Sequence, residues 1–180
     1  NLFKKVKKAT FRSINIPKFD KSIDDRCKKN SWFKLKKKPD ILILEGWCVG
    51  AKPEGGRSLN RPINILEKNA DKKKIWRSYV NNQLKSKYSK LFDQLDSLLY
   101  LKAKNFKLLK RWRLKQEKKL KMKSGTKKNS KIMNEREVET FMMTYQRITQ
   151  NMFKNAPKYS SAVIDLNENH QIKKVKFKHA

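Results

Sequence analysis

The glutamate Glu45 follows the most apolar run of the chain, in the stretch ILILEGW at residues 41–47. A carboxylate in or beside buried apolar structure is costly unless a cation or several hydrogen-bond donors hold it. At the end of a core strand, such a carboxylate can hold Mg²⁺, directly or through water, or orient the attacking group in phosphoryl transfer. Glu45 is therefore a candidate catalytic and magnesium-binding residue. A carboxylate that caps a helix or braces a loop is the alternative interpretation.

A second group of reactive side chains lies in the stretch FDKSIDDR at residues 19–26. Asp20 and Asp25 could accept the proton of a substrate hydroxyl, whereas Lys21 and Arg26 could bind a substrate carboxylate or phosphate. A charge-balanced surface loop would have the same composition, so the residues alone leave both interpretations open. Both groups follow segments that we expect to be strands, and ligands of open α/β sheets bind at the carboxyl ends of strands.

The chain is strongly basic, with 47 Lys and Arg residues against 16 Asp and Glu residues and a formal net charge of +31. A charge of this size is compatible with nucleic-acid binding. However, 38 of the basic residues are Lys and only 9 are Arg, and specific recognition of phosphates and bases favours Arg. The composition therefore favours a lysine-rich solvated surface, and it predicts that any nucleic-acid binding is weak and non-specific.

At 180 residues, of which 37% are hydrophobic, the chain is long enough for one domain with a hydrophobic core. No apolar run approaches the roughly 18 residues that span a bilayer, and no secretory signal is present. The two cysteines, Cys27 and Cys48, match neither a metal-binding spacing nor a disulfide framework. We therefore expect a single cytoplasmic domain over residues 1–180, with reduced thiols and no membrane partner.

Short apolar segments alternate with amphipathic ones, which is typical of an α/β domain. Strands are predicted at residues 13–19, 41–44, 97–101 and 161–166, followed by a basic edge strand or tail at 171–177. The run ILIL at residues 41–44 has no polar face, so it predicts a strand that is buried on both sides in a parallel sheet.

Helical spacing of apolar residues predicts helices at residues 2–9, 75–95 and 106–120. Another helix should begin at Asn134, because Glu135 and Glu137 follow in the first turn, and Pro157 should close it. A short helix or turn is expected at residues 27–38, and a flexible basic loop at residues 124–131.

Two stretches in this order, IPKFDKSIDDR at residues 16–26 and ILILEGWCVGAKP at residues 41–53, resemble the D-glycerate 3-kinase family. This family lies in the phosphoribulokinase–uridine kinase branch of the P-loop NTPases. The resemblance continues through WRSYVNNQL, WRLKQE and NEREVETFMMTYQRIT, so it covers nearly all of the chain. It implies a partial P-loop NTPase-like fold with three layers, in which helices flank a mostly parallel sheet.

The resemblance also implies an ATP-dependent phosphotransferase that acts on a small hydroxy acid, with D-glycerate as the leading acceptor and ATP and Mg²⁺ as cofactors. Glu45 then corresponds to the Walker B-like acidic residue near the Mg²⁺–phosphate site, and Asp20 is a second catalytic candidate. The same comparison places Lys21, Asp25 and Arg26 beside the acceptor substrate. The WRLKQE segment resembles the lid side of the family, where Arg111 or Arg113 would reach the nucleotide phosphates.

The chain differs from the family in one important feature: no GxxxxGK[ST] phosphate-binding loop occurs in its 180 residues. In the family this loop precedes the segment with which the chain begins, and its backbone N–H groups and Lys bind the β- and γ-phosphates. We therefore expect the C-terminal part of a kinase, which as an isolated chain is not a competent enzyme. The alternatives are a basic nucleic-acid-binding protein and a non-catalytic remnant that completes its site with another polypeptide.

Overall fold

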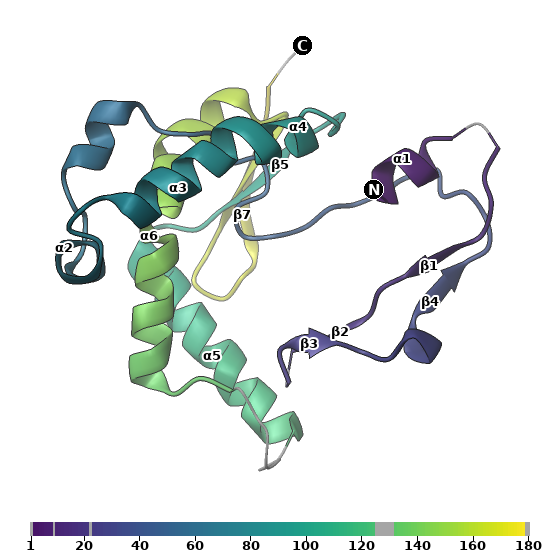
Figure 1. Cartoon of the computed structure of the whole chain (residues 1–180), viewed down its shortest axis with the longest axis horizontal. Coiled ribbons are helices and arrows are strands. Elements are labelled where there is room, and N and C mark those ends of the chain that lie inside the picture. The colour runs from purple at the N-terminus through teal and green to yellow at the C-terminus, as the bar shows by residue number, and fades with distance from the viewer. Residues whose placement is uncertain (1, 9, 22, 125–131, 179–180) are drawn as a thin grey trace. The chain divides into compact units, whose positions relative to one another are not determined.

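A computed structural model of the protein describes residues 2–8, 10–21, 23–124 and 132–178 (Figure 1). The chain divides into two compact units. The first comprises Asn1–Glu45 and Gln116–Met133, and the second comprises Gly46–Lys115 and Asn134–Ala180. The predicted loop at residues 124–131 lies outside the described residues except for its first residue, which ends a helix.

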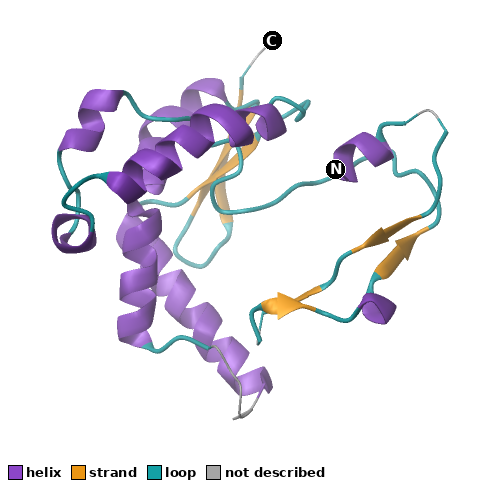
Figure 2. Cartoon of the chain, viewed as in Figure 1, coloured by secondary structure: helices purple, strands orange, loops and turns teal. Residues whose placement is uncertain are grey.

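The first unit contains a short helix and two small antiparallel sheets (Figure 2). Helix α1 (Leu2–Val6) precedes strand β1 (Ile14–Ile16), which pairs with β4 (Phe33–Leu35), and β2 (Phe19–Asp20) pairs with β3 (Asp25–Arg26). A 3₁₀ turn, η1 (Lys29–Ser31), lies between β3 and β4. The predicted strand at residues 13–19 ends at Ile16, because Pro17 has no backbone N–H to donate to a neighbouring strand.

The prediction of a buried strand at residues 41–44 is wrong for the described structure. These residues form no strand, and the side chains of Ile41 and Ile43 are 78% and 82% exposed. A strand without a polar face needs hydrogen-bonded neighbours and a covering layer on both sides. The described residues provide neither of these, so the most apolar run of the chain is exposed.

The second unit contains most of the helices. Its long helix α6 (Glu135–Tyr159) begins with a capping box, in which Asn134 and Glu137 each accept a hydrogen bond from the other's backbone N–H. Pro157 does not end this helix as predicted but lies in its last turn, two residues before the end. Helix α5 (Phe106–Ser124) belongs to the second unit up to Lys115 and to the first unit from Gln116 onward. Two short elements, η2 (Gly56–Asn60) and α2 (Ile65–Ala70), come first in this unit. The predicted helix at residues 75–95 follows, divided into α3 (Ile75–Gln83), a π-helical turn η3 (Leu84–Tyr88) and α4 (Ser89–Phe92).

A three-stranded sheet completes the second unit, in the order β5 (Leu99–Lys102), β6 (Ala162–Leu166) and β7 (Ile172–Phe177). Strand β5 is parallel to β6, and β7 is antiparallel to β6 at the edge of the sheet. One face packs into the hydrophobic core, which consists of Ala51, Leu84, Tyr100, Met152, Ala156 and Val163. Helices over a sheet with a parallel pair confirm the predicted α/β class.

On the opposite face of this sheet, apolar side chains of the two outer strands are exposed in the described structure, whereas Ala162 on the central strand is buried. Leu99 and Leu101 on β5 are 61% and 60% exposed, and Phe177 on β7 is 71% exposed. The predicted strand in SLLYL is therefore present, but only Tyr100 of β5 is fully buried.

Candidate functional site

The predicted substrate loop forms a tight hairpin within the first unit. Strands β2 and β3 place Asp20 directly opposite Asp25, and Phe19 opposite Arg26. The N–H of Cys27 donates to the carbonyl of Lys18 over 2.8 Å and extends the pairing. Side chains of directly opposed residues lie on the same face, so the hairpin brings the two predicted carboxylates together.

The turn of this hairpin has a strained residue. Asp24 adopts a left-handed conformation with φ of 53°, which Asp tolerates better than most residues. Lys21 lies at the start of the turn and is exposed, as are Asp25 and Arg26, whereas Asp20 is half-buried. Like charges directly opposite each other destabilise a strand pair, so a positively charged group between the two carboxylates would reduce their repulsion.

Glu45 is the last residue of the first unit before the chain enters the second. Its side chain is exposed, and within the described part of the chain it has no hydrogen-bond or ion-pair partner. The alternative interpretation, a carboxylate that caps a helix or braces a loop, therefore has no support among the described residues. The carboxylate is available for an external ligand.

The residues after Glu45 are fixed on helix α6. The indole of Trp47 donates a hydrogen bond to Thr149 Oγ1 over 3.0 Å and stacks on Tyr145 at a centroid distance of 5.4 Å. Burial raises the pKa of the neighbouring Cys48 thiol to about 12, so this thiol stays protonated. Gly50 turns the chain with φ of +78°. Trp47, Cys48 and Gly50 of the EGWCVG motif are therefore structural residues.

The two arginines predicted to reach nucleotide phosphates lie on α5 and already have partners. Arg111 Nη2 donates to Glu168 Oε2 over 2.7 Å, and this hydrogen bond holds the pKa of Glu168 below its usual value. Both side chains are exposed to solvent. Exposed ion pairs are weak, so Arg111 can leave Glu168 for another anionic partner. The guanidinium of Arg113 lies over the ring of Phe141, with 5.1 Å between its carbon and the ring centroid.

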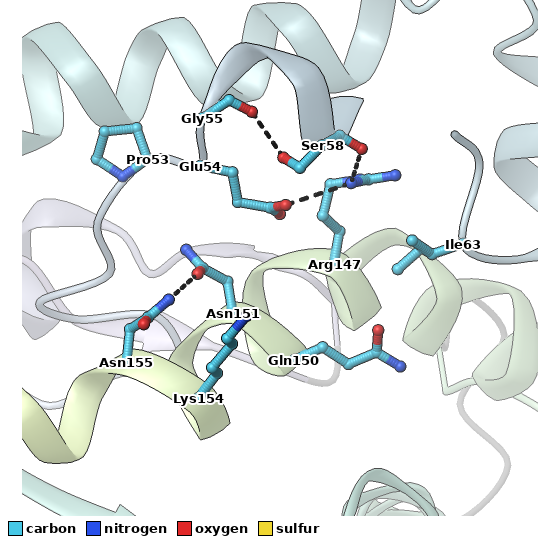
Figure 3. A pocket seen from close by; sticks show the side chains of 10 residues that line it. All are labelled: Pro53, Glu54, Gly55, Ser58, Ile63, Arg147, Gln150, Asn151, Lys154 and Asn155. Carbon is cyan, nitrogen blue, oxygen red and sulfur yellow. Dashed lines mark hydrogen bonds and ion pairs between the residues drawn. The ribbon is translucent and has the colours of Figure 1, made fainter. Parts of the chain in front are cut away.

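Sequence reasoning missed a polar cleft of about 370 Å³ in the second unit (Figure 3). Its lining consists of Pro53, Glu54, Gly55, Ser58, Ile63, Arg147, Gln150, Asn151, Lys154 and Asn155. Asn155 donates to the side chain of Asn151, and Lys154 is exposed on the same helix. The cleft therefore offers an ammonium group, amide groups and a carboxylate to a small polar ligand.

The buried Arg147 holds one wall of this cleft together. It donates two hydrogen bonds to Glu67, from Nε over 2.8 Å and from Nη2 over 2.6 Å, and its Nη1 lies 3.4 Å from Glu54 Oε2. It also donates to the backbone carbonyls of Ser58 and Arg61. These bonds occupy Nε and both terminal nitrogens, so Arg147 positions the 54–67 segment and is not available to bind a ligand.

The electrostatics of this pair follow from burial and charge. Burial of Glu67 raises its pKa, but hydrogen bonds from Arg147 and from the N–H of Ile63 outweigh burial and lower the pKa overall. The hydrogen bond to Glu67 raises the pKa of Arg147. Both groups are therefore charged at neutral pH. Sequence offered one local signal, because Asn64 three residues before Glu67 fits a helix N-cap, whereas its partner Arg147 lies 80 residues away.

The α/β fold, with a parallel strand pair, an antiparallel edge strand and flanking helices, is similar to part of the fold of P-loop kinases. The chain is similar in structure to D-glycerate 3-kinase from Cryptococcus neoformans var. grubii, with a TM-score of 0.66 and 22% identity over 92% of this chain. It is also similar to the YGR205w protein, with a TM-score of 0.64 and 25% identity over 97% of this chain. In sequence it is 31% identical over 151 residues to the uncharacterized kinase mug58 of Schizosaccharomyces pombe.

These similarities confirm the predicted resemblance to D-glycerate 3-kinase and its relatives. No protein-family model matches the chain. The chain spans about half the length of the curated relative, 51%, and 60% and 62% of the two solved structures. Over the described residues, no helix is long and apolar enough to cross a bilayer, and no group of three or more His, Cys, Asp or Glu side chains is arranged to hold a metal ion.

Proposed function

We propose that residues 1–180 form the acceptor-side part of a cytoplasmic, ATP-dependent phosphotransferase that acts on a small hydroxy acid, with D-glycerate as the leading acceptor. The main support is that a comparison of sequences and a comparison of structures both point to kinases. A kinase matches 81% of the chain in sequence, and a D-glycerate 3-kinase matches 92% of it in structure. We infer in addition that the chain is a fragment, because a GxxxxGK[ST] loop is absent from its residues.

The hairpin of the first unit is proposed to bind the acceptor. Its opposed carboxylates, Asp20 and Asp25, would accept hydrogen bonds from the hydroxyl groups, and Asp20 would take up the proton of the attacking hydroxyl. Lys21 lies in the turn and is exposed, so its ammonium group is proposed to approach the carboxylate of a hydroxy acid. Arg26 is also exposed and is the second candidate for this contact, although it lies with Phe19 on the face of the hairpin opposite to Asp20 and Asp25. This arrangement would orient the hydroxyl for in-line attack on the γ-phosphoryl group.

Glu45 fits a role in holding Mg²⁺. Magnesium keeps several waters and is typically bound by one or two carboxylates together with substrate phosphates, so a single exposed carboxylate suffices on the protein side. When bound, the metal would neutralise charge that develops on the transferring phosphoryl group. Arg111 would add positive charge at the nucleotide phosphates after release from Glu168, and Arg113 is the second candidate for this role.

The acceptor site is tested by replacing its cations in the longest translation product that contains residues 1–180. Lys21→Gln and Arg26→Gln should raise KM for D-glycerate at least about tenfold with a smaller effect on KM for ATP, because each removes a charge that binds only the acceptor. Lys28→Gln, two residues beyond the hairpin strand, is the matched control. The phosphorylated product is measured with each of a panel of hydroxy acids as the acceptor. Equal KM values for the hairpin variants and the control would exclude the hairpin as the acceptor site.

A further inference from the structure

The polar cleft of Figure 3 lies wholly within the second unit, between the segment at residues 53–63 and helix α6. The fold uses some of the polar groups that line it. Arg147 donates to the backbone carbonyl of Arg61, and Asn151 donates to that of Lys52, so both side chains tie α6 to the opposite segment. The groups that the fold does not use are the ones that a ligand could engage.

Lys154 supplies a free ammonium group. Its side chain is exposed, and it has no hydrogen-bond or ion-pair partner in the part of the chain that the structure describes. The same holds for the amide of Gln150. Both side chains extend from α6 in Figure 3, and residues four apart share one face of a helix. Together they offer N–H donors to one anionic group.

The opposite wall of the cleft carries the carboxylate of Glu54. Its Oε2 lies 3.4 Å from Arg147 Nη1, and its Oε1 accepts no hydrogen bond from the described residues. A carboxylate has about four acceptor positions, so Glu54 can accept from a further donor. The side chain is only 18% exposed, and a charge that is drawn away from water interacts more strongly with a charged partner.

Glu54 is also held in place without a ligand. Its backbone N–H donates to Asn81 Oδ1 over 2.8 Å, and its backbone carbonyl accepts from Asn81 Nδ2 over 3.1 Å. These two bonds fix the backbone, and Arg147 restrains the carboxylate. A group that is fixed before binding loses little conformational freedom when a ligand arrives. The acidic wall of the cleft is therefore preorganised.

The opposite charges of the two walls select the class of ligand. Glu54 would repel a simple anion, and Lys154 would repel a simple cation, whereas a molecule with both charges is attracted by both walls. The volume of about 370 Å³ lies near the lower end of the range for ligand pockets, so the ligand is small. A free α-amino acid carries an ammonium group and a carboxylate in a molecule of this size.

We propose that the polar cleft binds a free α-amino acid. The carboxylate of the amino acid accepts hydrogen bonds from Lys154 and Gln150, and its ammonium group donates to Glu54. The inference goes beyond the proposed function, because D-glycerate is an anion without an ammonium group. In addition, the acceptor hairpin belongs to the first unit and the cleft belongs to the second. The amino acid is thus a separate ligand and not a substrate of the phosphoryl transfer.

Isothermal titration calorimetry tests the proposal on the longest translation product that contains residues 1–180. The common α-amino acids are titrated singly, and at least one should bind with Kd below about 1 mM. Its analogues without the amino group and without the carboxylate should each bind at least about tenfold more weakly, because each leaves one charged wall without its partner. Lys154→Gln and Glu54→Gln should weaken binding to a similar extent. Lys158→Gln, one turn further along α6 and outside the cleft lining, is the matched control.

Absence of binding by every amino acid up to about 10 mM, or equal binding by Lys154→Gln and Lys158→Gln, would overturn the proposal. Undiminished binding of the analogue without the amino group would also overturn it, since the cleft would then be a simple anion site. Far-UV circular dichroism verifies that Glu54→Gln, which alters the contact with Arg147, is folded. The titrations contain neither ATP nor D-glycerate, so their outcome does not depend on the proposed function.

Discussion

At the scale of single residues, the described chain separates groups that are poised to bind a ligand from groups that hold the fold. Glu45, Lys21 and Arg26 are exposed on the first unit. Arg147 and Glu67 are buried and bond to each other in the second. The buried pair of Arg147 and Glu67 is therefore structural, whereas Glu45, Lys21 and Arg26, which we assign to chemistry, are accessible.

Replacement of Arg147 by Met should destabilise the protein strongly. It would leave Glu67 buried without its cation, and removal of one partner from a buried ion pair costs about 3–5 kcal/mol. The free energy of unfolding is measured by urea titration. Arg136→Met, at an exposed position in the first turn of the same helix, serves as the control. A loss of less than about 1 kcal/mol for Arg147→Met would show that the pair does not brace the 54–67 segment.

Stability should also depend on pH through Glu67. Its folded pKa lies below the usual value of 4.5, so the unfolded state binds more protons between the two values. This contribution to stability is fully present above about pH 4.5 and is lost as the pH falls through the folded pKa. In Glu67→Gln, the free energy of unfolding should therefore fall less steeply below pH 4.5 than in the unsubstituted protein. Urea titrations at a series of pH values test this, and parallel curves would contradict it.

At the scale of elements, local signals predicted those that depend on their own residues. Asn134 with the glutamates that follow it predicted the start of α6, and the basic segment at residues 171–177 predicted an edge strand or a tail, of which the structure has the edge strand β7. The run at residues 41–44 misled because burial of a strand depends on its neighbours, and among the described residues no strand pairs with this run. The N-cap at Asn64 is a local signal for the position of Glu67, but its pairing with Arg147 could not be predicted locally, since the two partners are 80 residues apart.

The turn after the EGW segment permits a sharp test of backbone geometry. Gly50 has φ of +78°, and a Cβ atom there would lie 2.7 Å from a methyl group of Leu98. Gly50→Ala should therefore destabilise the second unit by about 1–3 kcal/mol. Gly55→Ala is the matched control, because Gly55 has φ of −63° and nothing lies within 4 Å of the position that a Cβ atom would take there. Equal thermal stability of the two variants would contradict this account of the turn.

At the scale of the whole molecule, the sequence predicted the α/β class and the resemblance to D-glycerate 3-kinase, because the motifs occur in order over nearly all of the chain. The acceptor role of Asp20, Lys21, Asp25 and Arg26 stays a prediction; the structure places Asp20 opposite Asp25 in the pair of β2 and β3. It did not predict the polar cleft of Figure 3, because residues 53–63 and α6 meet only in the folded unit. Nor did it predict that Leu99, Leu101 and Phe177 are exposed on the sheet, because exposure depends on the layers that cover a sheet.

The assignment of phosphoryl transfer is tested most directly by the activity of one variant. The longest translation product that contains residues 1–180 is assayed with ATP, Mg²⁺ and D-glycerate, and phosphoglycerate is quantified. Glu45→Gln should lower kcat by orders of magnitude while KM for D-glycerate changes little, because the carboxylate would act on the Mg²⁺–phosphate group. Glu139→Gln, at an exposed position on α6, should leave kcat unchanged. Activity of Glu45→Gln within about twofold of the unsubstituted enzyme, or no phosphoglycerate from either, would contradict the account.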